Sequence, residues 1–113
     1  MSIDDFLSRA TKTTRKKLEV KEVDIEGDYV TYAKNRKCKA YKLIILNRKG
    51  FPDRTTLCPG GRILFIEFKR KGKTTTPAQI GVRKILESFG FAYHVCDKKG
   101  QAEAILDDFL EGL

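Results

Sequence analysis

Two acidic residues and one lysine stand out in the most basic part of the sequence. Residues 34–73 carry thirteen Lys and Arg side chains but only two carboxylates, Asp53 and Glu67, and Lys69 follows two residues after the second. Two carboxylates that are held close together repel each other unless a cation lies between them. Mg²⁺ meets this need, because it is usually bound through one or two carboxylates with water and substrate phosphates. We therefore expect a metal site that acts on a phosphate ester.

Phosphodiester hydrolysis is the reaction that these residues suit. It requires a deprotonated water in line with the phosphorus and positive charge near the phosphoryl oxygens, and metal ions supply both. Lys69 would position that water or stabilise the developing charge. The carbonyl of Phe68 lies between Glu67 and Lys69 and could complete the coordination. A third acid could hold the metal-bound water or a second ion, and Glu26, on the preceding predicted helix, is the best placed for this role.

The patterns around the acids predict a hairpin that brings them together. Residues 62–69 alternate as a strand, which places Glu67 and Lys69 on the same face with origins about 7 Å apart, at about 3.3 Å per residue. A short strand is expected at 51–57, and a tight Pro-Gly-Gly connection joins its end to the strand at 62–69. An earlier strand is expected at 40–46. Asp53 would then place its carboxylate beside Glu67.

The rest of the chain predicts helices on either side of a mixed sheet. A helix is expected from residue 23 to about residue 34, and another is expected to start at Pro77, with Thr76 as its N-cap and Gln79 as the capping-box partner. Residues 91–96 read as a strand and residues 102–110 as a closing helix. The apolar face of the second helix is expected to comprise Ile80, Ile85, Leu86 and Phe89.

Length and charge narrow the class of protein further. The 113 residues suit one α/β domain over 1–113, with residues 1–20 as a basic arm or short helix. Lys and Arg number 23 against 15 Asp and Glu, which excludes an acidic protein and favours a polyanionic partner. Three widely spaced cysteines support neither a disulfide scaffold nor a zinc ribbon, and we expect them to be buried. No apolar run is long enough to cross a membrane, so we expect a cytoplasmic protein.

The joint order of these motifs resembles a known nuclease family. Pro-Asp followed by Glu-x-Lys is similar to the PD-(D/E)xK nuclease superfamily, and the wider set resembles its VRR-NUC (virus-type replication-repair nuclease) family. The resemblance implies a restriction-endonuclease-like core and an endonuclease that uses Mg²⁺ or Mn²⁺ to cut DNA of particular structure. The motifs that carry it lie at residues 25–26, 40–43, 50–54, 59–61, 65–69, 72–73 and 77–79.

The resemblance also implies roles for single residues. Glu26, Asp53 and Glu67 correspond to the metal-binding acids, Lys69 to the catalytic lysine, and Gln79 to the glutamine at the start of the following helix. Small stand-alone members resemble homodimeric Holliday-junction resolvases, which suggests branched or duplex DNA as substrate and replication or repair proteins as partners. The residues expected to contact DNA are the basic ones of the hairpin and the following loop: Lys42, Arg54, Arg70, Lys71 and Lys73.

A dimer would place two equivalent sites on a symmetric junction. Two surfaces are candidates for it from the sequence. One is the apolar stripe of the last helix, and the other is the face of the first helix that bears two tyrosines. The stripe of the last helix comprises Ile105, Phe109, Leu110 and Leu113, and the tyrosines of the first helix are Tyr29 and Tyr32.

Each candidate residue also has an ordinary structural interpretation. Asp53 after proline could be a turn residue, and Glu67 could form an ion pair with Lys69 or Arg62. Glu26 lies among other acids near a helix start, and Gln79 is explained locally by the capping box. A non-catalytic nucleic-acid-binding module is therefore the alternative to a DNA nuclease, although it would have no use for two acids on a basic surface. A restriction-type or RNA-cleaving member of the same superfamily is a third option.

Overall fold

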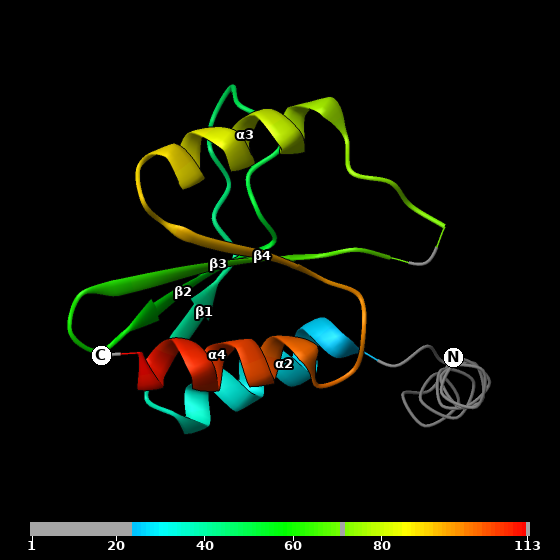
Figure 1. Ribbon diagram of the computed structural model, residues 1–113. Helices are drawn as coiled ribbons and strands as arrows, with labels where there is room; N and C mark the ends of the chain where they lie inside the picture. Colours follow the sequence, from blue (N-terminus) through cyan, green and yellow to red (C-terminus); the bar gives the residue numbers. More distant parts are fainter. Residues whose placement is uncertain (1–23, 71, 113) are drawn as a thin grey trace, which may run out of the picture.

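The computed structural model describes residues 24–70 and 72–112 (Figure 1). The expected basic arm at 1–20, as well as Lys71 and Leu113, lie outside the described residues. A four-stranded sheet forms the centre of the fold, in the order β1-β2-β3-β4. Its strands are β1 (Lys39–Tyr41), β2 (Arg54–Cys58), β3 (Arg62–Phe68) and β4 (Ala92–Cys96). The first three strands run antiparallel, and β4 runs parallel to β3.

Three helices cover the two faces of the sheet. Helices α2 (Ile25–Asn35) and α4 (Gln101–Glu111) lie side by side on one face, and α3 (Pro77–Ser88) lies on the other (Figure 1). This arrangement confirms the predicted α/β core with a mixed sheet flanked by helices. Among the described residues, none of these helices is both long enough and apolar enough to cross a membrane.

The alternation of β3 separates two apolar cores, as the sequence predicts. Leu64, Ile66 and Phe68 pack with α2 and α4, where Tyr29 and Leu106 are fully buried. The opposite face packs against α3, and its buried members are Phe65, Val82, Leu86 and Tyr93. Glu67 lies on this second face. The three cysteines are buried with free thiols, as expected.

The predicted strand at 40–46 is wrong beyond Tyr41, which pairs with Thr55 at the end of β1. If the ladder continued in the same register, Ile44 would lie opposite Pro52, which has no backbone N–H to donate. The chain instead leaves the sheet after Tyr41 and forms a loop that projects past α3 (Figure 1). The strand-like sequence of this segment is therefore exposed.

The predicted apolar face of α3 is also largely wrong. Val82 and Leu86, one helical turn apart, face the sheet and are buried. Ile80 and Ile85 are more than two-fifths exposed, and Phe89, just after the helix, is 73% exposed. The helix is thus rotated so that a second group of apolar side chains faces outward.

The residues of both surfaces that the sequence suggested for a dimer are largely engaged in contacts within the single chain. Tyr29 is fully buried, and its hydroxyl shares a hydrogen bond of 2.6 Å with Thr56. Tyr32 donates a hydrogen bond to Asp107 of α4, and Arg36 forms an ion pair with the same carboxylate. The apolar residues Ile105, Phe109 and Leu110 of α4 pack partly buried against the core.

Candidate active site

The register of the β2–β3 hairpin brings the two predicted acids together. Arg54 is paired with Ile66, so Asp53, one residue earlier, lies opposite Glu67. The backbone N–H of Asp53 donates to Glu67 Oε1 at 3.2 Å, and Asp53 Oδ2 accepts from the backbone N–H of Phe68 at 2.8 Å. Each acid is therefore positioned by the backbone of the other's strand, which fixes the two carboxyls relative to each other.

Glu67 is a buried carboxyl, and only one of its two oxygens has a hydrogen-bond partner in the part of the chain that the structure describes. Its side chain sits in the apolar strand β3 and the residue is only 4% exposed. Oε1 accepts from Asp53, but Oε2 is buried and has no hydrogen-bond partner among the described residues. Burial raises the pKa of Glu67 to about 8, and the neighbouring Asp53 carboxyl also raises it. Among residues 24–70 and 72–112, no Lys or Arg side chain forms an ion pair with Glu67.

These two acids fit a hard divalent cation. An unpaired buried carboxylate oxygen is costly, whereas a metal ion would satisfy it and remove the repulsion between the acids. The described residues contain no group of three or more His, Cys, Asp or Glu side chains arranged to hold a metal ion. The two carboxylates of Asp53 and Glu67 therefore suit an ion such as Mg²⁺, which keeps several waters and uses few carboxylates.

A basic cavity of about 280 Å³ opens beside the acids. Asp53 and Glu67 lie in its wall together with Lys69, Arg70 and Lys73. The backbone N–H of Lys69 donates to the Cys96 carbonyl at 2.7 Å, which ties the residue after β3 to the end of β4. The structure thus gathers the predicted lysine and two of the predicted DNA-contacting residues around the acids.

Helix α3 completes the cavity with its first turn. Thr76 and Gln79 form the predicted capping box: Gln79 N–H donates to Thr76 Oγ1 at 3.2 Å, and Gln79 Oε1 accepts from Thr76 N–H at 2.9 Å. Gln79 also lines the cavity. Capping uses its amide oxygen, so the amide NH₂ is the end that can donate to a ligand. Thr74 and Thr75 line the cavity as well, and the only sequence signal for them is their place just before this cap.

Glu26 has an ion-pair partner in this structure. Arg54 Nε donates to Glu26 Oε2 at 2.7 Å, and both side chains are about four-fifths buried. Arg54 also donates to the carbonyl of Ala40 at 3.3 Å. The guanidinium that the sequence assigned to DNA contact therefore links α2 to the sheet, and it binds the carboxylate that the sequence assigned to the metal.

The remaining predicted DNA contacts lie at the edge of this region. Lys42 is exposed on the loop after β1 and lines a second, shallow hollow that reaches Asp53. Lys71 lies outside the described residues. The cavity is thus lined by the end of β3, the following loop and the first turn of α3.

Asp53 is expected to have a structural role that can be separated from its charge. Asp53→Ala and Asp53→Asn both remove the negative charge beside Glu67, but only asparagine keeps an oxygen that accepts from the Phe68 N–H. We expect Asp53→Ala to unfold more easily than Asp53→Asn by about 1–3 kcal/mol, the cost of an unsatisfied buried donor. Urea unfolding of the two variants measures this difference. Equal stabilities would show that the bond contributes nothing.

Comparison with known proteins agrees with the motifs and the fold. No protein-family model matches the chain. The chain is 32% identical over 80 residues to a protein described as "Putative nuclease p44" from Acyrthosiphon pisum secondary endosymbiont phage 1, and the match covers 71% of this chain and 86% of that protein. A solved structure described as "VRR_NUC domain" matches with a TM-score of 0.62 at 24% identity, covering 77% of this chain and 99% of that domain. The chain therefore belongs to the family of this phage protein, and it has the fold of the VRR-NUC domain, the family that its motifs resemble.

Proposed function

We propose that this protein is a nuclease that hydrolyses DNA phosphodiester bonds with Mg²⁺ or Mn²⁺. The observation that carries the proposal is the pair of acids in a basic cavity, one of them with a buried oxygen that no described residue satisfies. The relative described as a nuclease and the VRR-NUC fold support it. A module that only binds nucleic acid would gain nothing from these acids, because they oppose phosphate binding.

Asp53 and Glu67 would hold the metal ion, with the Phe68 carbonyl as a further oxygen donor. When bound, the ion would lower the pKa of a water and neutralise charge on the phosphoryl oxygens. Lys69 lies close enough to share the cavity with Glu67 and would orient the attacking water or stabilise the developing charge. Arg70 and Lys73 would hold the phosphates, and the Gln79 amide would donate to a phosphate or to the water. Glu26 would act as third acid only after leaving Arg54.

The proposal is tested by cleavage of labelled DNA. Single-stranded, linear duplex, flap and four-way-junction substrates are incubated with the full chain and Mg²⁺ or Mn²⁺, and parallel reactions contain a chelator. We expect metal-dependent cuts that the chelator abolishes, with the junction cut faster than the linear duplex. Tight DNA binding without any metal-dependent cut would instead favour a binding module.

We further propose that the active form is a homodimer in the cytoplasm of a bacterial or phage-infected cell. A single active site with one pair of acids would cut one strand at a time, whereas resolution of a junction requires two cuts. A two-fold dimer would supply two equivalent sites. The dimer would use a surface other than those of α2 and α4 that pack inside the monomer. The mass in solution at micromolar concentration tests this proposal, and a monomeric mass would contradict it.

A further inference from the structure

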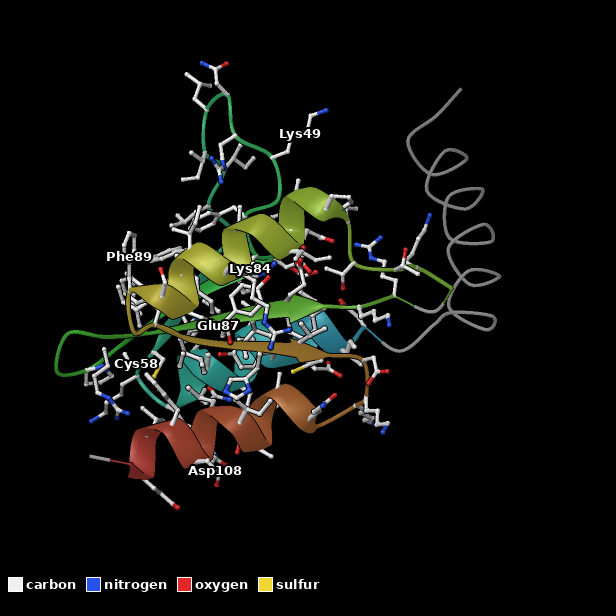
Figure 2. The ribbon with its side chains drawn as sticks, turned by 45° about the horizontal axis from the view of Figure 1, so that its top comes forward. Lys49, Cys58, Lys84, Glu87, Phe89 and Asp108 are labelled. Atoms are coloured by element: carbon white, nitrogen blue, oxygen red, sulfur yellow. The ribbon has the colours of Figure 1, made fainter. Side chains whose placement is uncertain are left out.

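The loop between β1 and β2 has an unusually apolar tip. We call residues 42–50 the apolar-tip loop, because Leu43, Ile44, Ile45 and Leu46 follow one another there. Ile44 is 84% and Leu46 86% exposed. Figure 2 shows the loop, which carries Lys49, projecting beyond α3. Exposed apolar groups gathered at one place on a small protein mark a site of contact with a partner.

The apolar-tip loop has a defined shape. The Arg48 N–H donates to the Ile45 carbonyl at 3.2 Å, and the intervening Asn47 has a φ of 60°, a left-handed conformation that asparagine tolerates. At the end of the loop, Gly50 has a φ of 93°, and a Cβ there would lie 2.5 Å from the carbonyl of Ala78 in α3. The loop is thus packed against the first turn of α3.

This contact places the loop beside the candidate active site. Ala78 directly precedes Gln79, which lines the cavity. A second hollow of about 190 Å³ lies under the loop and is lined by Lys42, Ile44 and Asp53, among others. Asp53 thus borders both spaces. A group bound in the second hollow would therefore lie next to Asp53.

The charges of the loop indicate the chemistry of its partner. Lys42, Arg48 and Lys49 are all exposed, and residues 42–50 contain no acid. A second copy docked through this loop would oppose cations to cations around the apolar tip. A partner must therefore offer negative charge and an apolar surface within a few ångströms of each other. DNA with unstacked bases offers both, since phosphates attract the cations and base faces receive apolar side chains.

We propose that the apolar-tip loop holds unpaired or unstacked bases at a branch point of DNA while the adjacent cavity receives the phosphodiester to be cut. Ile44 and Leu46 contact the base faces, and Lys42, Arg48 and Lys49 bind the flanking phosphates. The inference rests on the proposed function, and it assigns the preference for branched DNA to a loop of the same domain.

The experiment compares the full chain with the double variant Ile44→Ser/Leu46→Ser. Binding to a four-way junction and to a linear duplex of the same sequence is measured by fluorescence anisotropy with Ca²⁺, without Mg²⁺ or Mn²⁺. A 2-aminopurine at the branch point reports base unstacking. The matched control is Phe89→Ser, which removes a side chain of similar exposure from the far end of α3 (Figure 2).

We expect the double variant to bind the junction about tenfold more weakly and to lose the 2-aminopurine signal, with duplex binding changed by less than about twofold. Phe89→Ser should behave as wild type. An unchanged junction affinity in the double variant would overturn the inference, as would equal affinity of the wild type for both DNAs. Conversion from dimer to monomer by the double substitution, measured by sedimentation, would identify the tip as a self-association surface instead.

Metal-dependent cleavage of linear duplex separates this inference from the proposed function. The double variant should cut duplex at a rate within about twofold of the wild type, because Asp53, Glu67 and Lys69 are untouched. If the wild type cuts duplex and the double variant keeps full affinity for the junction, only the inference is overturned. A wild type that neither binds nor cuts any DNA would overturn the proposed function and the inference together.

Discussion

Glu67→Gln is expected to lower the rate of metal-dependent DNA cleavage by at least about a thousandfold and, at the same time, to stabilise the metal-free fold. Glutamine has the shape of glutamate and keeps an oxygen for the Asp53 N–H. It removes the buried negative charge, and with it the oxygen expected to bind the metal. Loss of activity with a gain in stability is the opposite of what disruption of the fold would produce.

The stability gain is expected to depend on pH. Burial and Asp53 raise the pKa of Glu67 to about 8 from an ordinary value of 4.5, so the folded state holds this proton more tightly than the unfolded state. The stability that this protonated carboxyl contributes is present in full below about pH 4.5 and is lost as pH rises to about 8. Glutamine has no proton to lose, so its advantage over wild type should grow from pH 5 to pH 8 and then remain constant.

Urea unfolding in chelator at pH 5 and pH 8.5 measures this difference. Added Mn²⁺ should stabilise the wild type at pH 8.5 and stabilise Glu67→Gln far less, because binding to the native state alone shifts the folding equilibrium. The control is Glu87→Gln, which removes an exposed carboxylate of α3 that forms an ion pair with Arg83. It should leave both activity and stability nearly unchanged. Cleavage at the wild-type rate by Glu67→Gln would end the argument for a metal site.

Lys69→Met is the second substitution with a large expected effect. We expect the cleavage rate to fall by about a hundredfold or more, with Mn²⁺ still bound by Asp53 and Glu67. Methionine keeps most of the length of lysine but not its charge. Lys69 is exposed and lies beyond the last residue of β3, so the fold should not change.

Mn²⁺ affinity is measured by calorimetry, and the cleavage rate is measured under saturating DNA, so that weaker binding does not mimic slower chemistry. Lys84→Met, on the exposed side of α3 (Figure 2), is the matched control for a lost surface charge. A variant that binds DNA less tightly but cuts at the wild-type rate once saturated would place Lys69 among the phosphate contacts, with no part in the chemistry.

The central part of this site follows from local sequence patterns. The period of two in residues 62–69 and the tight Pro-Gly-Gly turn are enough to place Asp53 opposite Glu67, since a hairpin fixes its own register. The start of α3 is equally local, because Thr76, Pro77 and Gln79 form a complete N-terminal signal. These features need no knowledge of distant contacts.

Other features depend on contacts between distant segments, which the sequence alone does not specify. The ion pair of Glu26 with Arg54 joins residues 28 positions apart and requires α2 to lie across the start of β2. The rotation of α3, which buries Val82 and exposes Ile85, depends on how the helix docks on the sheet. A strand-like sequence also does not guarantee a strand, as Ile44 and Leu46 show, when the neighbouring strand offers proline at the matching position.

The turn of the β2–β3 hairpin lies at the opposite end of these strands from Asp53 and Glu67. Gly60 and Gly61 have φ values of 82° and 73°, and a side-chain carbon added at either would meet no atom within 4 Å. Because the pairing from Arg54–Ile66 to Cys58–Arg62 holds the strands together, extra residues inserted between the glycines would extend outward into open space. This turn is therefore the place to attach a fluorophore or to fuse a DNA-targeting domain, since the end of the hairpin that carries Asp53 and Glu67 would keep its register.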